Sequence, residues 1–128
     1  MYEILIVGGG PAGLTAAIYA ARAGKHVAVL ERGSTGGQII SAPLVENYPG
    51  IPSVSGTELA RQMTEQACTF GAEIVYTEAV GLEKTPAGFR VLCTDGVREA
   101  KTVILATGTY LHGKIYVGEY TAESGPDG

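Results

Sequence analysis

Residues 1–31 read MYEILIVGGGPAGLTAAIYAARAGKHVAVLE, and this stretch predicts the fold of the chain. Its first part, Tyr2–Val7, is a short apolar run typical of a buried parallel strand. Residues 8–13 (GGGPAG) follow at once and open a segment with helical periodicity. A second β-branched run, His26–Leu30, then ends at Glu31. The order strand, glycine turn, helix, strand and acid predicts the start of a parallel sheet with a ligand site at its edge.

The glycine turn has the spacing G-x-G-x-x-G, and each of its residues has a physical role. Gly8 allows a tight turn out of the strand, Gly10 lets a pyrophosphate approach the backbone, and Gly13 lets the helix lie close to the strand. The first helical residues, Pro11 and Ala12, place the positive end of the helix against the phosphates. The pattern predicts dinucleotide binding. A glycine-rich turn that only connects strand and helix is the alternative.

Glu31 lies about 20 residues beyond the glycines, where an acid can accept hydrogen bonds from a ribose diol. A carboxylate repels a 2′-phosphate, so it favours an unphosphorylated ribose, as in FAD or NAD. Arg32, the next residue, weakens that preference slightly. The motif alone does not separate FAD from NAD.

The composition narrows the classes of partner. The chain has 128 residues, enough for one domain, with a net charge of −4 and no basic run, so a nucleic-acid partner is not expected. No apolar stretch approaches the roughly 20 residues of a membrane span, and the N-terminus lacks the features of a signal peptide. We therefore expect a cytoplasmic protein.

Side chains for catalysis or metal binding are not evident in the sequence. Its two cysteines, Cys68 in a predicted helix and Cys93 in a predicted strand, are far apart and form no C-x-x-C pair. We expect both to be reduced thiols in the core, since free cysteine is often buried. No catalytic residue and no metal ligand is assigned.

The middle of the chain alternates between a loop and regular elements. The loop, Gly33–Pro52, is long for a compact domain, which suggests a functional role, and a short helical turn is expected near residues 38–42. Its Gln38 and Asn47 can hydrogen-bond a planar ring or a ribityl chain, although loop amides more often bond within their own loop. A helix follows from an N-cap at Ser55 to about Phe70, with Glu58 at N3, and then a strand at Glu73–Tyr76.

The second half predicts an antiparallel meander of three short strands and then a return to the sheet. The three meander strands are residues 79–85, 89–94 and 97–101, and the returning parallel strand is 102–106. Thr107 and Gly108 end that strand at the edge where open α/β sheets bind ligands. The predicted fold is a three-layer, Rossmann-like FAD/NAD(P)-binding α/β domain. Its sheet has the order 3-2-1 plus the returning strand, with helices on one face and the meander on the other.

Residues 1–108 resemble the FAD-binding domain of low-molecular-weight thioredoxin reductases and related flavoprotein disulfide reductases. The residues that carry the resemblance are GGGPAG (8–13), Glu31, GGQI (36–39), ENYPG (46–50), ELARQM (58–63) and TVILATG (102–108). The combination of GGQ with ENYPG is more specific than the glycine motif.

The resemblance implies how FAD would be held. The pyrophosphate would lie on residues 8–13 and the adenosine ribose on Glu31, while Gly37, Gln38 and Asn47 would contact the flavin end. The adenine would meet the backbone near Ala79 and Val80, and Thr107 and Gly108 would lie beside the cofactor. In the family, electrons pass from NADPH to the flavin, to a C-x-x-C disulfide, and then to thioredoxin.

Parts of the family pattern are missing from this sequence. It has one glycine motif, no C-x-x-C pair and no second FAD segment, so residues 1–108 look like the first segment of a split domain. We therefore expect the family's NADPH domain to be absent from these residues, and a thioredoxin-like partner to act through that missing domain. A sheet without its closing strand would expose apolar surface, which is expected to favour self-association. The divergent tail, residues 109–128, resembles the flavoprotein that modifies the wobble uridine of tRNA. An N-terminal segment of that enzyme and a non-catalytic dinucleotide-binding module are the alternative functions.

Overall fold

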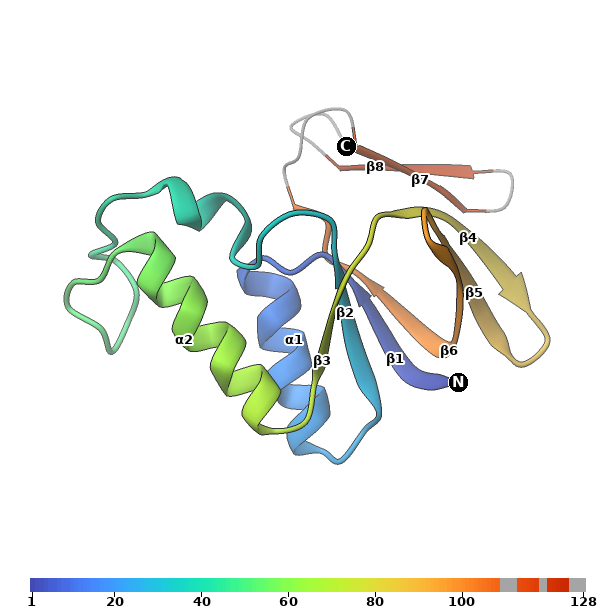
Figure 1. The fold of residues 1–128 in the computed structure, drawn as a ribbon, viewed down its shortest axis with the longest axis horizontal. Helices are drawn as coiled ribbons and strands as arrows, with labels where there is room; N and C mark the ends of the chain where they lie inside the picture. The colour runs from blue at the N-terminus through green and yellow to red at the C-terminus, as the bar shows by residue number, and fades with distance from the viewer. Residues whose placement is uncertain (109–112, 118–119, 125–128) are drawn as a thin grey trace.

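The computed structural model describes residues 1–108, 113–117 and 120–124 (Figure 1). Eight strands form one sheet in the order β3-β2-β1-β6-β5-β4-β7-β8. The elements are β1 (Tyr2–Val7), α1 (Pro11–Arg22), β2 (Val27–Glu31), the 3-10 helix η1 (Gly37–Ser41), α2 (Gly56–Thr69), β3 (Glu73–Tyr76), β4 (Ala79–Thr85), β5 (Gly88–Cys93), β6 (Gly96–Leu105), β7 (Gly113–Val117) and β8 (Tyr120–Ser124).

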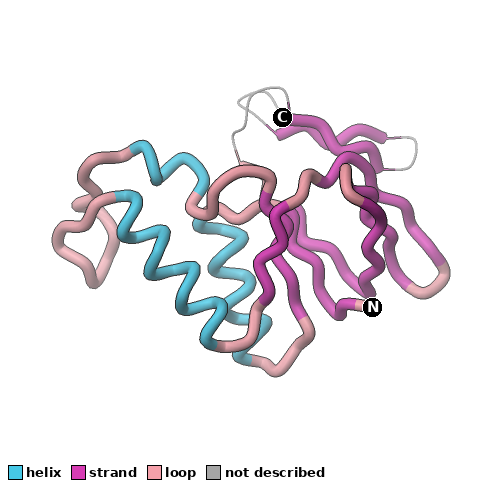
Figure 2. The backbone as a smooth tube through the Cα atoms, viewed as in Figure 1, coloured by secondary structure: helices cyan, strands magenta, loops and turns pink. Residues whose placement is uncertain are grey.

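The helices cover one face of the central strands, and the meander packs against the other face (Figure 2). Side chains alternate along a strand, so Ile6 faces one way and Leu5 the other. Ile6 packs in a cluster with Ala17 of α1 and Ala67 of α2. Leu5 packs in a second cluster with Val91 of the meander. The predicted arrangement of helices, parallel sheet and meander in three layers is confirmed.

The predicted boundary between the meander and the returning strand was wrong. Residues 97–101 and 102–106 were expected to be two strands, but β6 is continuous. Ala100 pairs with Phe89 of β5 on one side and with Tyr2 of β1 on the other. No turn residue separates the two halves, so a single strand belongs to both the meander and the parallel sheet. The meander is therefore a curled extension of the sheet.

The glycines beside α1 fit the roles predicted from their spacing. Gly8 has φ +110°, and a Cβ there would lie 2.1 Å from the carbonyl oxygen of Ala106. A Cβ on Gly13 would lie 1.8 Å from the carbonyl oxygen of Gly8. Any larger residue would therefore push the helix away from β1 or the turn away from β6.

The loop between β2 and α2 contains the predicted helical turn as η1. Beyond it, Val45 and Val54 exchange backbone hydrogen bonds of 2.7 and 3.1 Å, which close residues 46–53 into a projecting loop. The predicted cap of α2 is confirmed, because the Ser55 hydroxyl accepts a hydrogen bond from the Glu58 amide at 3.1 Å. Neither α1 nor α2 is long and apolar enough to cross a bilayer.

The prediction that both cysteines lie in the core was wrong. Cys68 is exposed and Cys93 is only partly buried. Ala67 takes the buried position on α2, and the next residue along a helix points about 100° away from it. In the tail, β7 pairs in parallel with β4.

Candidate nucleotide-binding site

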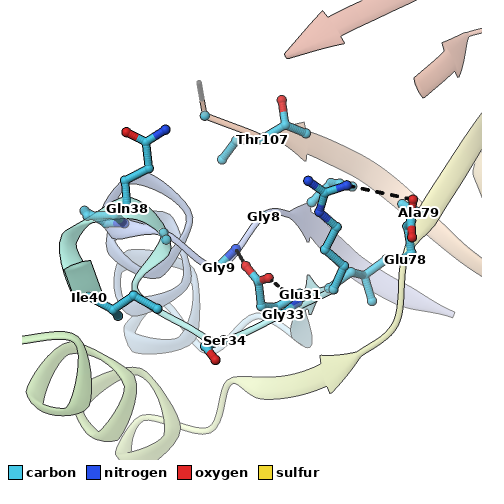
Figure 3. Close-up of a pocket in the computed structure, with 18 of the residues that line it drawn as sticks. Gly8, Gly9, Glu31, Gly33, Ser34, Gln38, Ile40, Glu78, Ala79 and Thr107 are labelled. Atoms are coloured by element: carbon cyan, nitrogen blue, oxygen red, sulfur yellow. Dashed lines mark hydrogen bonds and ion pairs between the residues drawn. The ribbon is translucent and has the colours of Figure 1, made fainter. Parts of the chain in front are cut away.

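A cavity of about 730 Å³ lies at the carboxyl ends of β1, β2 and β6 (Figure 3). Figure 3 shows Gln38 and Ile40 on one side of it, Glu78 and Ala79 on the opposite side, and Glu31 between them. The volume is within the usual range for a small-molecule site. Its position matches the place where open α/β sheets bind ligands.

The N-terminus of α1 opens into this cavity without a side-chain cap. Gly10 is the N-cap residue, Pro11 follows, and the first turn contains no acidic residue. The amides of Ala12 and Gly13 therefore have no partner within the helix, and the helix dipole adds positive potential at the same point. Such an end is suited to bind a phosphate group.

Gly10 gives a direct test of whether a phosphate group fits here. Its φ of −77° is open to any residue, so the backbone does not require glycine. A Cβ on Gly10 would meet only the Cα of Gly37, at an ordinary 3.8 Å. The protein itself leaves this space open, whereas a ligand on the helix end would fill it. The donors and the open space together fit the pyrophosphate of a dinucleotide.

Glu31 is held beside the glycine turn by backbone donors (Figure 3). Its Oε1 accepts a hydrogen bond from the Gly9 amide at 2.9 Å, and its Oε2 accepts one from the Gly33 amide at 2.6 Å. These bonds fix the orientation of the carboxylate. Each oxygen retains a lone pair, so the group can still accept hydrogen bonds from a ribose diol.

The η1 side of the cavity is also fixed by glycines. The Gly36 amide donates to the Gly9 carbonyl at 2.7 Å, which ties this loop to the glycine turn. Gly36 and Gly37 have φ values of +104° and +58°, in the left-handed region. The paired glycines therefore let η1 begin directly above the turn and bring Gln38 to the cavity.

The opposite wall is the link from β3 to β4, residues 77 and 78, which we call the strap, together with Ala79 at the start of β4. The Thr77 amide donates to the Glu31 carbonyl at 3.0 Å, so the strap runs beside the acid. Arg32 and Glu78 form an ion pair of 3.9 Å near the same wall. Because this pair is largely exposed, it contributes little stability.

Most of the residues predicted to bind the cofactor line the cavity. Those that do are Gly8, Gly10, Pro11, Glu31, Arg32, Gly37, Gln38, Thr107 and Gly108. Ala12 and Gly13 lie in the first turn of α1 and are not part of the lining. Asn47 lies in the projecting loop, and Val80 lies at a β-bulge next to the strap, so neither is part of the lining. Their contacts with a cofactor remain predictions.

The sequence did not point to several residues of the cavity, chiefly Gly33, Thr77 and Glu78. A signal was present for the last two, because they follow a parallel strand at the ligand-binding edge. The shifted pKa values of the described residues belong to groups outside the lining. Among the described residues, no group of three or more His, Cys, Asp or Glu side chains could hold a metal ion.

Comparison with known proteins agrees with this geometry. Residues 2–115 match the family described as pyridine nucleotide-disulphide oxidoreductase. The chain is 44% identical to the thioredoxin reductase of Treponema pallidum over 108 residues, or 84% of the chain and 35% of that protein. It is 42% identical to the thioredoxin reductase of Aquifex aeolicus over 122 residues, or 93% of the chain and 38% of that protein.

A solved structure, the thioredoxin reductase of Streptococcus pyogenes, superposes with a TM-score of 0.84 at 45% identity. That superposition covers 88% of this chain and 37% of the other. The chain thus spans little more than a third of the length of the relatives that it matches. The match over residues 2–115 and the shared fold show that the chain belongs to the pyridine nucleotide-disulphide oxidoreductase family.

Proposed function

We propose that this chain is the FAD-binding part of a thioredoxin reductase. The observation that carries the proposal is the uncapped start of α1, with open space at Gly10 and an oriented carboxylate at Glu31 beside it. These features suit the pyrophosphate and the adenosine ribose of a dinucleotide. The likeness to thioredoxin reductases favours FAD over NAD as the ligand of this site.

The bound flavin would supply the redox chemistry, and the residues of this chain bind and orient it. The amides of Ala12 and Gly13 would hold the pyrophosphate, and Glu31 would accept hydrogen bonds from the ribose. Gln38 and Thr107 lie at the cavity where the flavin end would extend. NADPH as electron donor, a thioredoxin-like protein as acceptor and a cytoplasmic location belong to the same proposal for the whole protein.

The two alternative functions, a segment of a tRNA-modifying flavoprotein and a non-catalytic dinucleotide-binding module, differ in the ligand that they predict. A segment of a tRNA-modifying flavoprotein would also bind FAD, and the resemblance of residues 109–128 is what supports it. The relatives that match most of the chain are thioredoxin reductases, which favours a thioredoxin reductase over a tRNA-modifying flavoprotein. A non-catalytic dinucleotide module would bind ADP-like ligands with no preference for flavin.

A flavin titration of the purified chain tests the proposal. We expect added FAD to give a shifted visible absorption band that saturates at one FAD per chain, and NAD to compete weakly. The Glu31→Lys variant is expected to bind FAD at least about tenfold more weakly, because it loses the ribose acceptor. A chain that binds NAD tightly and no flavin would contradict the proposal.

A further inference from the structure

Among the described residues, Thr77 is the one polar residue that is buried, with 7% of its surface exposed. It also lines the cavity. Its hydroxyl donates a hydrogen bond of 2.6 Å to Oδ1 of Asp95. Asp95 lies 18 residues further along, in the turn between β5 and β6. The nucleotide end of the cavity is thus tied to a turn of the meander by one side-chain contact.

Asp95 is itself held in place by Arg98. The two guanidinium nitrogens of Arg98 donate to the two carboxylate oxygens of Asp95, at 2.7 and 3.1 Å. A bidentate pair of this kind fixes direction as well as distance. The hydrogen bonds from Arg98 and Thr77 hold the pKa of Asp95 well below its usual range, so the carboxylate stays an acceptor.

The backbone of the strap is bonded on both sides of this contact. The Thr77 amide donates to the Glu31 carbonyl at 3.0 Å, and the Thr94 amide donates to the Glu78 carbonyl at 3.0 Å. The ladder between β4 and β5 is irregular immediately beyond, between Ala79 and Gly81. A bulge interrupts the regular pairing there, and the Thr77–Asp95 bond is the side-chain contact that links the strap to the meander, whereas the Arg32–Glu78 ion pair links it to the end of β2.

We infer that Thr77, Asp95 and Arg98 form a positioning network that sets the distance between the strap and Glu31, and thereby the affinity for the adenosine half of the cofactor. The inference rests on the proposed function. The path runs from Arg98 through Asp95 and Thr77 to the last residue of β2, whose carboxylate is bonded to the glycine turn. None of the three is a catalytic residue.

The test compares Thr77→Val with Thr77→Ser in the 128-residue chain, with ADP and FAD as the probes. Valine keeps the shape and removes the hydroxyl, whereas serine keeps the hydroxyl and loses a methyl group. We expect the valine variant to bind ADP and FAD about tenfold more weakly, and the serine variant to stay within about twofold of the wild type. Adding Asp95→Asn to Thr77→Val is expected to cause little further loss of affinity, because the valine has already disconnected Asp95 and Arg98 from the strap.

Glu83→Gln is the matched control, since it breaks an exposed ion pair with Arg90 in the same meander. It should leave both affinities unchanged. Affinities are measured well below the unfolding midpoint of each variant, so that lost stability is not read as lost binding. If folded Thr77→Val binds ADP like the wild type, or if Thr77→Ser loses as much affinity, the positioning role is refuted while the proposed function stands. If the wild-type chain binds neither ADP nor FAD, both fail.

Discussion

Among single residues, Gly10 and Gly13 belong to one motif but are glycine for different reasons. A Cβ on Gly13 would lie 1.8 Å from backbone, whereas a Cβ on Gly10 would have an ordinary contact at 3.8 Å. Gly13→Ala should therefore destabilise the fold by about 3 kcal/mol, because backbone must move. Gly10→Ala should cost about 1 kcal/mol, as alanine is a poor N-cap, yet weaken FAD binding at least about tenfold.

Urea unfolding and FAD titration of the two variants separate these effects. The expected pattern is a stable Gly10→Ala chain that has lost affinity, and an unstable Gly13→Ala chain. Tight FAD binding by Gly10→Ala would mean that the pyrophosphate does not pass over this residue. This contrast follows from the structure, since the spacing G-x-G-x-x-G alone assigns a role to each glycine but not its cost.

Among the elements, the first turn of α2 carries a pH-dependent contribution to stability. Hydrogen bonds from Arg61, and then from Gln62, lower the pKa of Glu58 from its ordinary 4.5 to about 2. A carboxyl with a lowered pKa stabilises the fold above its unfolded pKa. That contribution is lost as pH falls from about 4.5 to about 2. Glu58→Gln should therefore lower the urea midpoint at pH 6, and its difference from the wild type should shrink towards pH 2.

Ser55→Ala is the control in the same turn, because its hydroxyl caps the helix without titrating. It should cost about 1 kcal/mol at both pH values. A Glu58→Gln penalty that is the same at pH 6 and pH 2 would show that the bonds to Arg61 do not matter in solution. The effect is expected to be small, since the Glu58 side chain is exposed and its charge is screened.

The elements also show what sequence patterns can predict. The cap at Ser55, the helical turn near Gln38 and the strand Glu73–Tyr76 depend on neighbouring residues, and all three are confirmed. The continuity of β6 depends on pairing with β1 on one edge and β5 on the other, which no local pattern encodes. The exposure of Cys68 likewise depends on which face of α2 meets the sheet.

At the scale of the whole molecule, the helices and the meander share the same central strands. Leu5 and Leu30 pack against the meander, while Ile6 and Val29 pack against the helices. We therefore expect one cooperative unfolding transition. Val91→Ala, which removes two buried methyl groups from the meander, should lower the free energy of unfolding by about 2 kcal/mol. The helical circular-dichroism signal and the hydrogen-exchange protection of the β4, β5 and β6 amides should report the same loss of stability.

Val97→Ala is the comparison on the next strand, where 54% of the side chain is exposed. It should change stability by no more than about 0.5 kcal/mol. If Val91→Ala lowers the hydrogen-exchange protection of the β4, β5 and β6 amides but leaves the helical transition in place, the meander and the helix layer are separate units. That result would contradict the shared core.

The site was predictable where one stretch of sequence builds it, and hidden where distant segments meet. Residues 8–11 and Glu31 form their half of the cavity within a single strand-helix-strand unit. The strap became visible only in the structure, because Thr77 is held by Asp95 through a contact between separate elements. The predicted flavin contact of Asn47 lies on a loop outside the cavity lining and still awaits a test.

We expect the carboxyl edge of the sheet to bind the adenosine diphosphate half of FAD. Amide ¹H–¹⁵N spectra of the chain with and without FAD test it most directly, because each shifted signal reports a position. The largest shifts are expected at Gly9, Gly10, Ala12, Gly33 and the strap. Saturating FAD that leaves these amides unchanged, or that shifts only residues on the outer face of α2, would contradict it.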